Sequence, residues 1–187
     1  GRAAAPTPTK GKCLPAFQPV ELATLVDHVP AGNAWLHEMK YDGYRCLIAV
    51  GGGLARAYTR SGLDWSDKFA PVVAAAAKLP AISALIDGEV VVLDAAGKSN
   101  FQALQAGLKG GKANLVFFAF DLLSLDGEDL RGQPLTTRKE ELAKLIGKGK
   151  GTIRFSEHIR GQGEKLLAGF CEPGETLEDA VRREVFE

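Results

Sequence analysis

The 187-residue chain is 45% hydrophobic and 25% charged, which is typical of a globular domain with a sizeable core and excludes disorder over most of its length. Lysine plus arginine and aspartate plus glutamate each number 23, so the net charge is zero and any contact with nucleic acid must come from a local patch. Cys13, Cys46 and Cys171 are odd in number and far apart, which argues against a disulfide framework or a zinc site. We therefore expect a cytoplasmic protein.

The two ends of the chain differ in character from its middle. Residues 1–16 resemble a linker from a longer protein, and residues 1–10 lack the apolar core of a signal peptide. No apolar run approaches the ~20 residues that a membrane span needs. The sequence therefore predicts no membrane contact.

Apolar runs separated by glycine- and proline-rich turns predict short strands and helices in the first half of the chain. Asp-Gly is a strong turn pair, because glycine accepts positive φ, so Lys40, Asp42 and Gly43 are expected in a turn between two strands. In chain order we expect a short helix or turn within residues 17–30, strands at 34–39, 44–50 and 54–58, and a helix over 66–79.

The second half continues the irregular alternation of strands and helices. We expect short strands at 85–86 and 90–93 around Asp87-Gly88-Glu89, a helix over 99–108 capped by Ser99, a strand at 115–123, a helix over 137–146 and a strand at 153–155. Several strand pairs are joined by turns too short for a crossover. The predicted fold class is therefore α+β, with antiparallel sheets and flanking helices, and not a doubly wound parallel sheet.

The segment Lys40-Tyr-Asp-Gly-Tyr-Arg45 combines a lysine and an arginine on either side of the Asp-Gly turn. Asp-Gly alone is typical of an ordinary turn with an exposed lysine. A lysine becomes a nucleophile only when it loses its proton, which desolvation or a neighbouring cation favours. Arg45 is a candidate for that cation, and its planar fork also suits phosphate oxygens.

Four segments together resemble the adenylation domain of ATP-dependent DNA ligases, whose first motif is shared with mRNA capping enzymes. The approach over residues 18–27 and the run Trp35-Leu-His-Glu38 are similar to the ligase domain of bacterial ligase D, a multifunctional end-joining enzyme. The four segments are Lys40-Tyr-Asp-Gly-Tyr-Arg45, Thr59-Arg60-Ser61-Gly62, Asp87-Gly88-Glu89 and Phe118-Ala-Phe120-Asp121-Leu122-Leu123.

The resemblance implies an ATP-grasp-like adenylation domain over residues 17–168 that encloses a nucleotide cleft. Lys40 would attack the α-phosphate of ATP and hold AMP as a phosphoramidate, with Mg²⁺ offsetting charge on the leaving pyrophosphate. The partners implied are DNA with nicks or breaks and other domains of an end-joining ligase. The expected activity is that of an ATP-dependent DNA ligase in DNA repair.

The same resemblance assigns the remaining site residues. Arg45 and Arg60 would contact ribose or phosphates, and Glu38 would help to bind the nucleotide. Glu89 would accept a hydrogen bond from a ribose hydroxyl or bind metal through water. Phe120 would stack on adenine, although Phe117, Phe118 and Phe120 are each also candidates for the core. Strand alternation places Phe118 and Phe120 on one face and Phe117 on the other. Asp42 and Asp87 are either site residues or turn formers.

After Ala168 the sequence departs from the pattern of the ligase family. The expected Glu-Gly-x-x-x-Lys strand and Lys-x-Lys segment do not occur after Ala168, so we expect impaired adenylation. Residues 169–187 resemble a truncated Nudix box, in which Glu184 and Glu187 would face one side of a helix. We favour a capped amphipathic helix over a metal site. The alternative functions are a non-catalytic nucleotide- or DNA-binding remnant and a Nudix-type pyrophosphohydrolase fragment.

Overall fold

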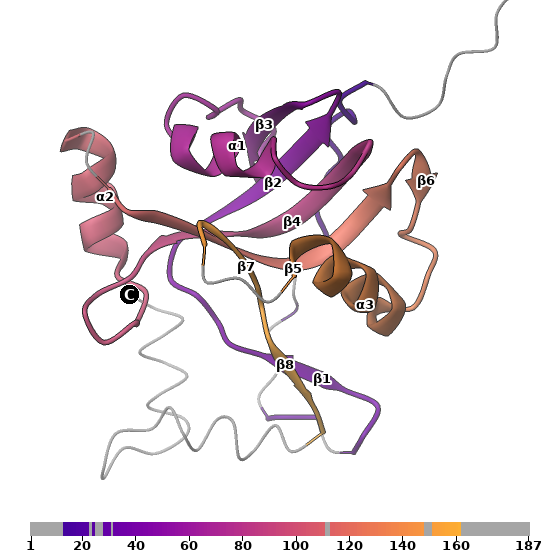
Figure 1. Cartoon of the computed structure of the whole chain (residues 1–187). Helices are drawn as coiled ribbons and strands as arrows, with labels where there is room; N and C mark the ends of the chain where they lie inside the picture. Colours follow the sequence, from indigo (N-terminus) through magenta and orange to yellow (C-terminus); the bar gives the residue numbers. More distant parts are fainter. Residues whose placement is uncertain are drawn as a thin grey trace, which may run out of the picture. The chain divides into compact units, whose positions relative to one another are not determined.

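The computed structural model describes residues 13–22, 24, 28–30, 32–110, 113–147 and 151–161 (Figure 1). The chain divides into two compact units. The first comprises residues 1–21 and 41–156, and the second comprises residues 22–40 and 157–187. The predicted Nudix-like tail and the domain boundary predicted at residue 168 lie outside the described residues.

The first unit is built on a six-stranded sheet with strand order β3-β2-β4-β5-β6 and with β7 beside β5 (Figure 1). Every pairing is antiparallel except that of β5 with β7. This arrangement confirms the predicted α+β class with antiparallel sheets and flanking helices. The strands are β2 (Tyr44–Gly51), β3 (Leu54–Thr59), β4 (Ser83–Val92), β5 (Leu115–Leu125), β6 (Glu128–Asp129) and β7 (Ile153–Phe155). The helices are α1 (Ala70–Ala76), α2 (Phe101–Gly110) and α3 (Leu135–Ile146).

Alternation of side chains along the central strands gives the sheet two apolar faces. The larger cluster joins one face of the sheet to the three helices, and Phe117 lies in it with no exposed surface. Burying side chains of this size stabilises the fold by about 1.5–3 kcal/mol each relative to leaving them in water. Its members from β2 and the helical segments include Cys46, Ile48, Val50, Phe69, Val72, Leu104 and Leu142.

The opposite face carries a smaller cluster, which the N-terminal segment covers. Leu14, Phe17 and Val20 pack against Leu47, Ala49 and Leu85. Residues 13–22 form neither helix nor strand, so the helix or turn predicted within residues 17–30 is wrong for 17–22. Of the apolar residues whose spacing predicted a helix, Leu22 is exposed, and Leu25 and Val26 lie outside the described residues.

Helices α2 and α3 begin at residues other than those predicted. Asn100, and not the predicted Ser99, caps α2, because its side-chain oxygen accepts a hydrogen bond from the Ala103 amide at 2.8 Å. Helix α3 begins at Leu135, directly after Pro134, and not at the predicted Thr137. None of the helices in the described part of the chain is long and apolar enough to cross a membrane.

The second unit contains a two-stranded antiparallel sheet of β1 (Leu36–Glu38) and β8 (His158–Arg160). Strand β1 thus pairs with a segment more than a hundred residues away, and not with β2. The predicted direct pairing of residues 34–39 with 44–50 across an Asp-Gly turn is therefore wrong. The intervening residues 40–43 do lie outside any strand, as predicted, and so does Met39, which was predicted at the end of the first strand.

Strand β4 is continuous over ten residues. The sequence predicts two short strands that flank Asp87-Gly88-Glu89, but these three residues pair with both neighbouring strands. Their backbone groups are therefore hydrogen-bonded within the sheet. The two acidic side chains of Asp87 and Glu89 project from a strand and not from a turn. Asp87 is a mid-strand residue and not a turn former.

Candidate functional site

The predicted site residues of the first unit lie mainly on its three central strands. Arg45 of β2 is directly opposite Glu89 of β4, and Glu89 is directly opposite Phe118 of β5. Residues directly opposite each other in an antiparallel sheet project from the same face. A cation, a carboxylate and an aromatic ring therefore stand in one row across the sheet, on the face opposite the helices.

Phe120 follows this row on β5, at an irregular position of the strand. The β4–β5 register shifts between Asp87 and Gly88, which face Asp121 and Ala119, so Phe120 is the extra residue of a β-bulge. Bulges re-aim side chains and are common beside active sites. The Arg45 guanidinium carbon lies 5.4 Å from the centre of the Phe120 ring, within cation–π distance. Phe118 and Phe120 are half-buried and Phe117 is fully buried on the opposite face, as alternation predicts.

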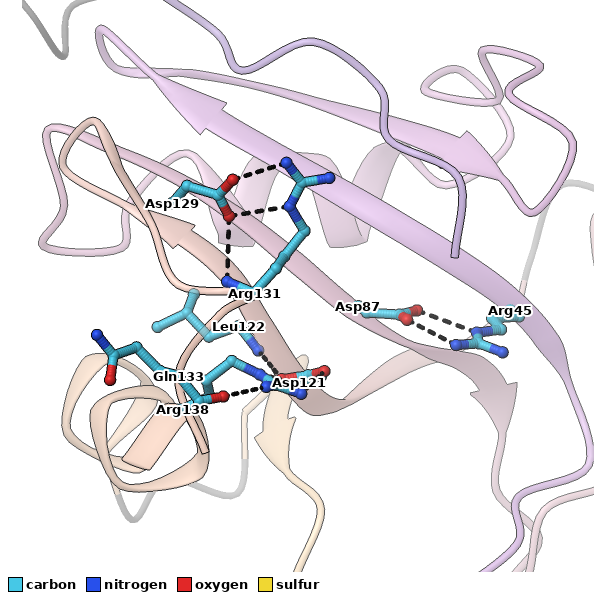
Figure 2. A network of polar contacts seen from close by, with 8 residues as sticks. All are labelled: Arg45, Asp87, Asp121, Leu122, Asp129, Arg131, Gln133 and Arg138. Atoms are coloured by element: carbon cyan, nitrogen blue, oxygen red, sulfur yellow. Dashed lines mark hydrogen bonds and ion pairs between the residues drawn. The ribbon is translucent and has the colours of Figure 1, made fainter. Parts of the chain in front are cut away.

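Arg45 is anchored by a bidentate ion pair with Asp87 (Figure 2). Its Nε and Nη2 donate to the two carboxylate oxygens at 3.2 and 2.8 Å, and the Asp87 side chain is only 4% exposed. Burial raises the pKa of Asp87, against the opposing effect of Arg45. Burial is the largest single effect on Arg45 and lowers its pKa, but the hydrogen bond to Asp87 and the negative charges of Asp87, Glu89 and Asp121 together raise the pKa of the guanidinium. Each charge is thus held in a poorly hydrated place by the other.

A second bidentate pair lies beside the first. Asp121 of β5 is directly opposite Asp87, and it accepts hydrogen bonds from Nε and Nη2 of Arg138 on α3 at 2.8 and 2.9 Å (Figure 2). Like charges that face each other across a sheet are destabilising unless each is compensated. The two arginines supply that compensation from different elements of the first unit.

Two glycines of the predicted motifs are required by close packing. A Cβ on Gly88 would collide with the ring of Phe117 and the carbonyl oxygen of Phe118, and one on Gly43 would collide with the carbonyl oxygen of Val90. Gly43 is not among the described glycines with positive φ. The prediction that a positive φ requires glycine at this position is therefore wrong. Close approach to β4, and not a left-handed backbone, excludes a side chain at Gly43.

An aromatic stack directly follows the predicted nucleophile in the chain. Tyr41 stacks on Phe118 with ring centres 4.0 Å apart and an interplanar angle of 11°. Arg154 of β7 lies 5.8 Å from the same ring. The Asp42 amide, next in sequence, donates to the Ser99 hydroxyl at 2.9 Å. These contacts fix the chain immediately after Lys40.

The other predicted residues are placed separately. Lys40 and Glu38 belong to the second unit, where Glu38 is half-buried on β1 directly opposite His158 and Lys40 is exposed beyond the strand. Arg60 is exposed in the turn after β3, and the described residues include no ion-pair partner for it. Of the predicted set, the structure brings together Arg45, Glu89 and Phe120.

Tyr41, Arg138 and Arg154 contact this region but are not predicted as site residues. Tyr41 stands inside the Lys-x-Asp-Gly segment, where an aromatic residue is a readable signal. Arg138 and Arg154 come from α3 and β7, far along the chain, and no local pattern links them to β5. Only the folded sheet shows their proximity.

The donor set of this face bears on the predicted Mg²⁺. The described residues contain no group of three or more His, Cys, Asp or Glu side chains that could hold a metal ion. Mg²⁺ is commonly held by one or two carboxylates together with substrate phosphates and water. Glu89 is the carboxylate in the row of Arg45, Glu89 and Phe118, and its oxygens are ligands of the kind that Mg²⁺ accepts together with a nucleotide.

Comparisons with known proteins identify the family of this chain. The model of the ATP dependent DNA ligase domain matches residues 19–173. This chain belongs to the ATP-dependent DNA ligase domain family. The multifunctional non-homologous end joining protein LigD of Pseudomonas aeruginosa is 37% identical over 163 residues, which cover 86% of the chain and 19% of that relative. A probable DNA ligase of Streptomyces coelicolor is 38% identical over 143 residues, which cover 70% of the chain and 28% of that relative.

Solved structures of ligase domains resemble the chain as well. The ligase domain of LigD from M. tuberculosis matches with a TM-score of 0.61 and 33% identity, over 71% of this chain and 42% of that one. A mycobacterial DNA ligase D complexed with ATP and MES matches with a TM-score of 0.59 and 32% identity, over 72% of this chain and 43% of that one. The chain therefore spans less than half the length of each of these two ligase structures.

The Arg45–Asp87 pair generates a stability prediction. Replacing Arg45 by alanine leaves the buried Asp87 carboxylate without its partner, and we expect a loss of about 1–3 kcal/mol in the free energy of unfolding at neutral pH. Because burial raises the pKa of Asp87, the loss should shrink as the pH falls and the carboxylate is protonated. Urea denaturation at several pH values measures both effects.

The matched control is the Arg56–Asp64 pair on the neighbouring strand. Its side chains are 55% and 42% exposed, so Arg56→Ala should change the free energy of unfolding by less than about 1 kcal/mol. The double change Arg45→Ala with Asp87→Ala should restore part of the stability lost by Arg45→Ala alone. Equal losses for Arg45→Ala and Arg56→Ala would contradict the structural importance of the buried pair.

Proposed function

We propose that this ligase-family chain forms a covalent lysyl-AMP, with Lys40 as the nucleophile and ATP as the donor. The observation that carries the proposal is that Arg45, Glu89 and Phe120 lie on neighbouring strands of the sheet, while Phe118 stacks on Tyr41, the residue that follows Lys40. Arg45, Glu89 and Phe120 offer a phosphate ligand, a carboxylate and an aromatic surface, which are the three kinds of group that a nucleotide needs. The similar mycobacterial structure complexed with ATP supports the choice of nucleotide.

The proposed step balances as a nucleotidyl transfer. The neutral amine of Lys40 attacks the α-phosphorus of ATP, a P–N bond forms, and the bond to the bridging oxygen of pyrophosphate breaks. The amine loses its proton and the electron pair leaves with pyrophosphate. Bound Mg²⁺ would offset negative charge on the phosphates. Glu89 is the residue that would hold it together with the nucleotide.

Arg45 and Arg60 have different expected roles. Two nitrogens of Arg45 are engaged by Asp87, so its guanidinium is oriented before any ligand arrives and presents its remaining donor edge to a phosphate. Arg60 is exposed at the end of β3 and would reach a phosphate as a mobile cation. We assign Arg45 to the bound nucleotide and Arg60 to the phosphates of either ATP or DNA.

The adenine ring is proposed to stack on Phe120. Tyr41 already covers one side of Phe118 at 4.0 Å, which leaves no space for a base between those two rings. Phe120 projects from the bulge and contacts Arg45 through its ring. Glu38 of the second unit is proposed to bind the nucleotide as well, on the strength of the motif alone.

The biological role proposed is the sealing of DNA breaks in end joining, within a longer protein. The LigD relatives are named for non-homologous end joining, and the chain covers only a fraction of their length. The alternative of a non-catalytic nucleotide- or DNA-binding remnant keeps the same sheet face without the covalent step. The Nudix-type alternative depends on residues 169–187, which lie outside the described residues.

The first functional prediction concerns Lys40. Lys40→Ala should abolish covalent labelling by α-labelled ATP with Mg²⁺ and leave the melting temperature unchanged, because the side chain is exposed and lies outside the strands. Lys144→Ala, on the exposed surface of α3, is the matched control and should label like the parent chain. Label retained by Lys40→Ala would assign the nucleophile elsewhere, and absence of label in the parent chain would favour the non-catalytic alternative.

The second functional prediction separates Phe120 from Phe118. Phe120→Ala should weaken ATP binding by about 1–3 kcal/mol, or roughly 5- to 150-fold in Kd, through lost stacking. Phe118→Ala removes the stack with Tyr41 and should mainly lower the melting temperature. Isothermal titration with ATP, together with thermal denaturation, tests both. If Phe120→Ala lowers the melting temperature with ATP affinity unchanged, Phe120 is a core residue.

The third functional prediction concerns rate. After Ala168 the chain contains neither the Glu-Gly-x-x-x-Lys nor the Lys-x-Lys segment of the family pattern, and cations of this kind position the triphosphate and its leaving group. The isolated chain should therefore bind ATP but become labelled much more slowly than a ligase domain that contains both segments. A single-turnover comparison of the two measures this, and equal rates would show that the segments are dispensable.

A further inference from the structure

The charges of this electrically neutral chain are unevenly distributed. Residues 68–86 and 95–120 contain five lysines and no aspartate or glutamate, so the remainder of the chain carries five more acidic than basic residues. These two stretches form α1, the start of β4, the loop after β4, α2 and the start of β5. The segments that contain α1 and α2 therefore carry a net positive charge, which the overall charge conceals.

A groove of about 250 Å³ lies within this basic region. Its residues come from the start of β2, from the turn before α1 and from α2 (Figure 1). The aromatic rings of its floor are fixed by packing, since Trp65 contacts both Tyr44 and Phe69 edge-on. The lining residues are Tyr44, Trp65, Lys68, Gln105, Leu108 and Lys109.

The two lysines of the groove differ from three other exposed cations of the first unit. Arg56, Arg131 and Lys144 are each paired with an acid. Among the residues that the structure describes, Lys68 and Lys109 have no such partner. Lys68 is instead held with its Nζ 3.7 Å from the centre of the Trp65 ring. A cation–π contact positions the ammonium group without neutralising its charge.

We propose that this groove binds the sugar-phosphate backbone of DNA, with Lys68 and Lys109 each contacting a phosphate. The proposal rests on the proposed function, which supplies DNA as the polymer. Phosphate contacts of this kind position a protein on DNA without reading its sequence. Gln105, which also donates to the Tyr44 hydroxyl at 3.5 Å, adds a neutral hydrogen-bonding group on the same rim.

The groove is distinct from the proposed nucleotide site. Tyr44 and Arg45 are consecutive in β2 and point to opposite faces of the sheet, and Tyr44 packs with the helix-side cluster. The groove therefore opens on the helix side, whereas Arg45 and Asp87 lie on the other face. Further lysines of the same acid-free stretches, Lys78 and Lys98, are exposed on this unit. A charge distribution that continues beyond one groove fits a polymer better than a single nucleotide.

The test measures binding of a fluorescein-labelled nicked DNA duplex by anisotropy between about 50 and 200 mM salt. The variant Lys68→Gln/Lys109→Gln removes two proposed phosphate contacts, so the slope of log K against log salt should become shallower by about two. The control Arg56→Gln/Lys144→Gln removes the same net charge from cations that already have acid partners, and its slope should match that of the parent chain. Lysyl-AMP formation should be equal in all three proteins.

A second measurement uses the tryptophan of the groove itself. The chain has two tryptophans, so Trp65 is the sole one in a Trp35→Phe background, and DNA should quench its emission. An unchanged salt slope in the lysine variant, unquenched Trp65 emission, or failure of the parent chain to bind DNA would each overturn the proposal. Failure of the proposed function would appear separately, as absence of covalent label on the parent chain.

Discussion

The pairing of Arg45 with the buried Asp87 is the interaction on which the site face depends. A carboxylate in the middle of a sheet is tolerated only with a partner, and a lysine would not reproduce the two parallel hydrogen bonds that Arg45 makes. Asp121 faces Asp87 and accepts hydrogen bonds from Arg138, so α3 is joined to β5 beside the Arg45–Asp87 pair. Charge compensation thus links β2, β4, β5 and α3 into one positioned surface.

The pairing with Asp87 engages only part of the Arg45 guanidinium. The guanidinium has five N–H donors, and Asp87 accepts from only two of its nitrogens. The ion pair therefore orients the group without consuming its capacity to bind a phosphate. The ring of Phe120 beside it contributes to the same orientation from the β-bulge.

The sequence predicts the elements of the first unit well where periodicity is strong. Strands β2, β3 and β5 and the three helices lie close to their predicted ranges, and the opposite facing of Phe117 and Phe118 follows from alternation. The partner of β1 was not predictable, because β8 is short and more than a hundred residues away. Asp87-Gly88-Glu89 looks like a turn locally, and only the pairing of β4 on both sides makes it a strand. Arg138 and Arg154 carry no local signal at all.

The continuity of β4 through the Asp87-Gly88-Glu89 motif has a consequence for motion. Amide groups that are hydrogen-bonded in the centre of a sheet exchange with solvent mainly through global unfolding. The groups that would hold a nucleotide therefore stand on the most slowly opening part of the molecule. Lys40 lies outside any strand, and the chain that follows it is held to this sheet by side-chain contacts such as the stack of Tyr41 on Phe118, and not by strand pairing. Local opening of residues 39–43 would therefore leave the hydrogen bonds of β4 intact.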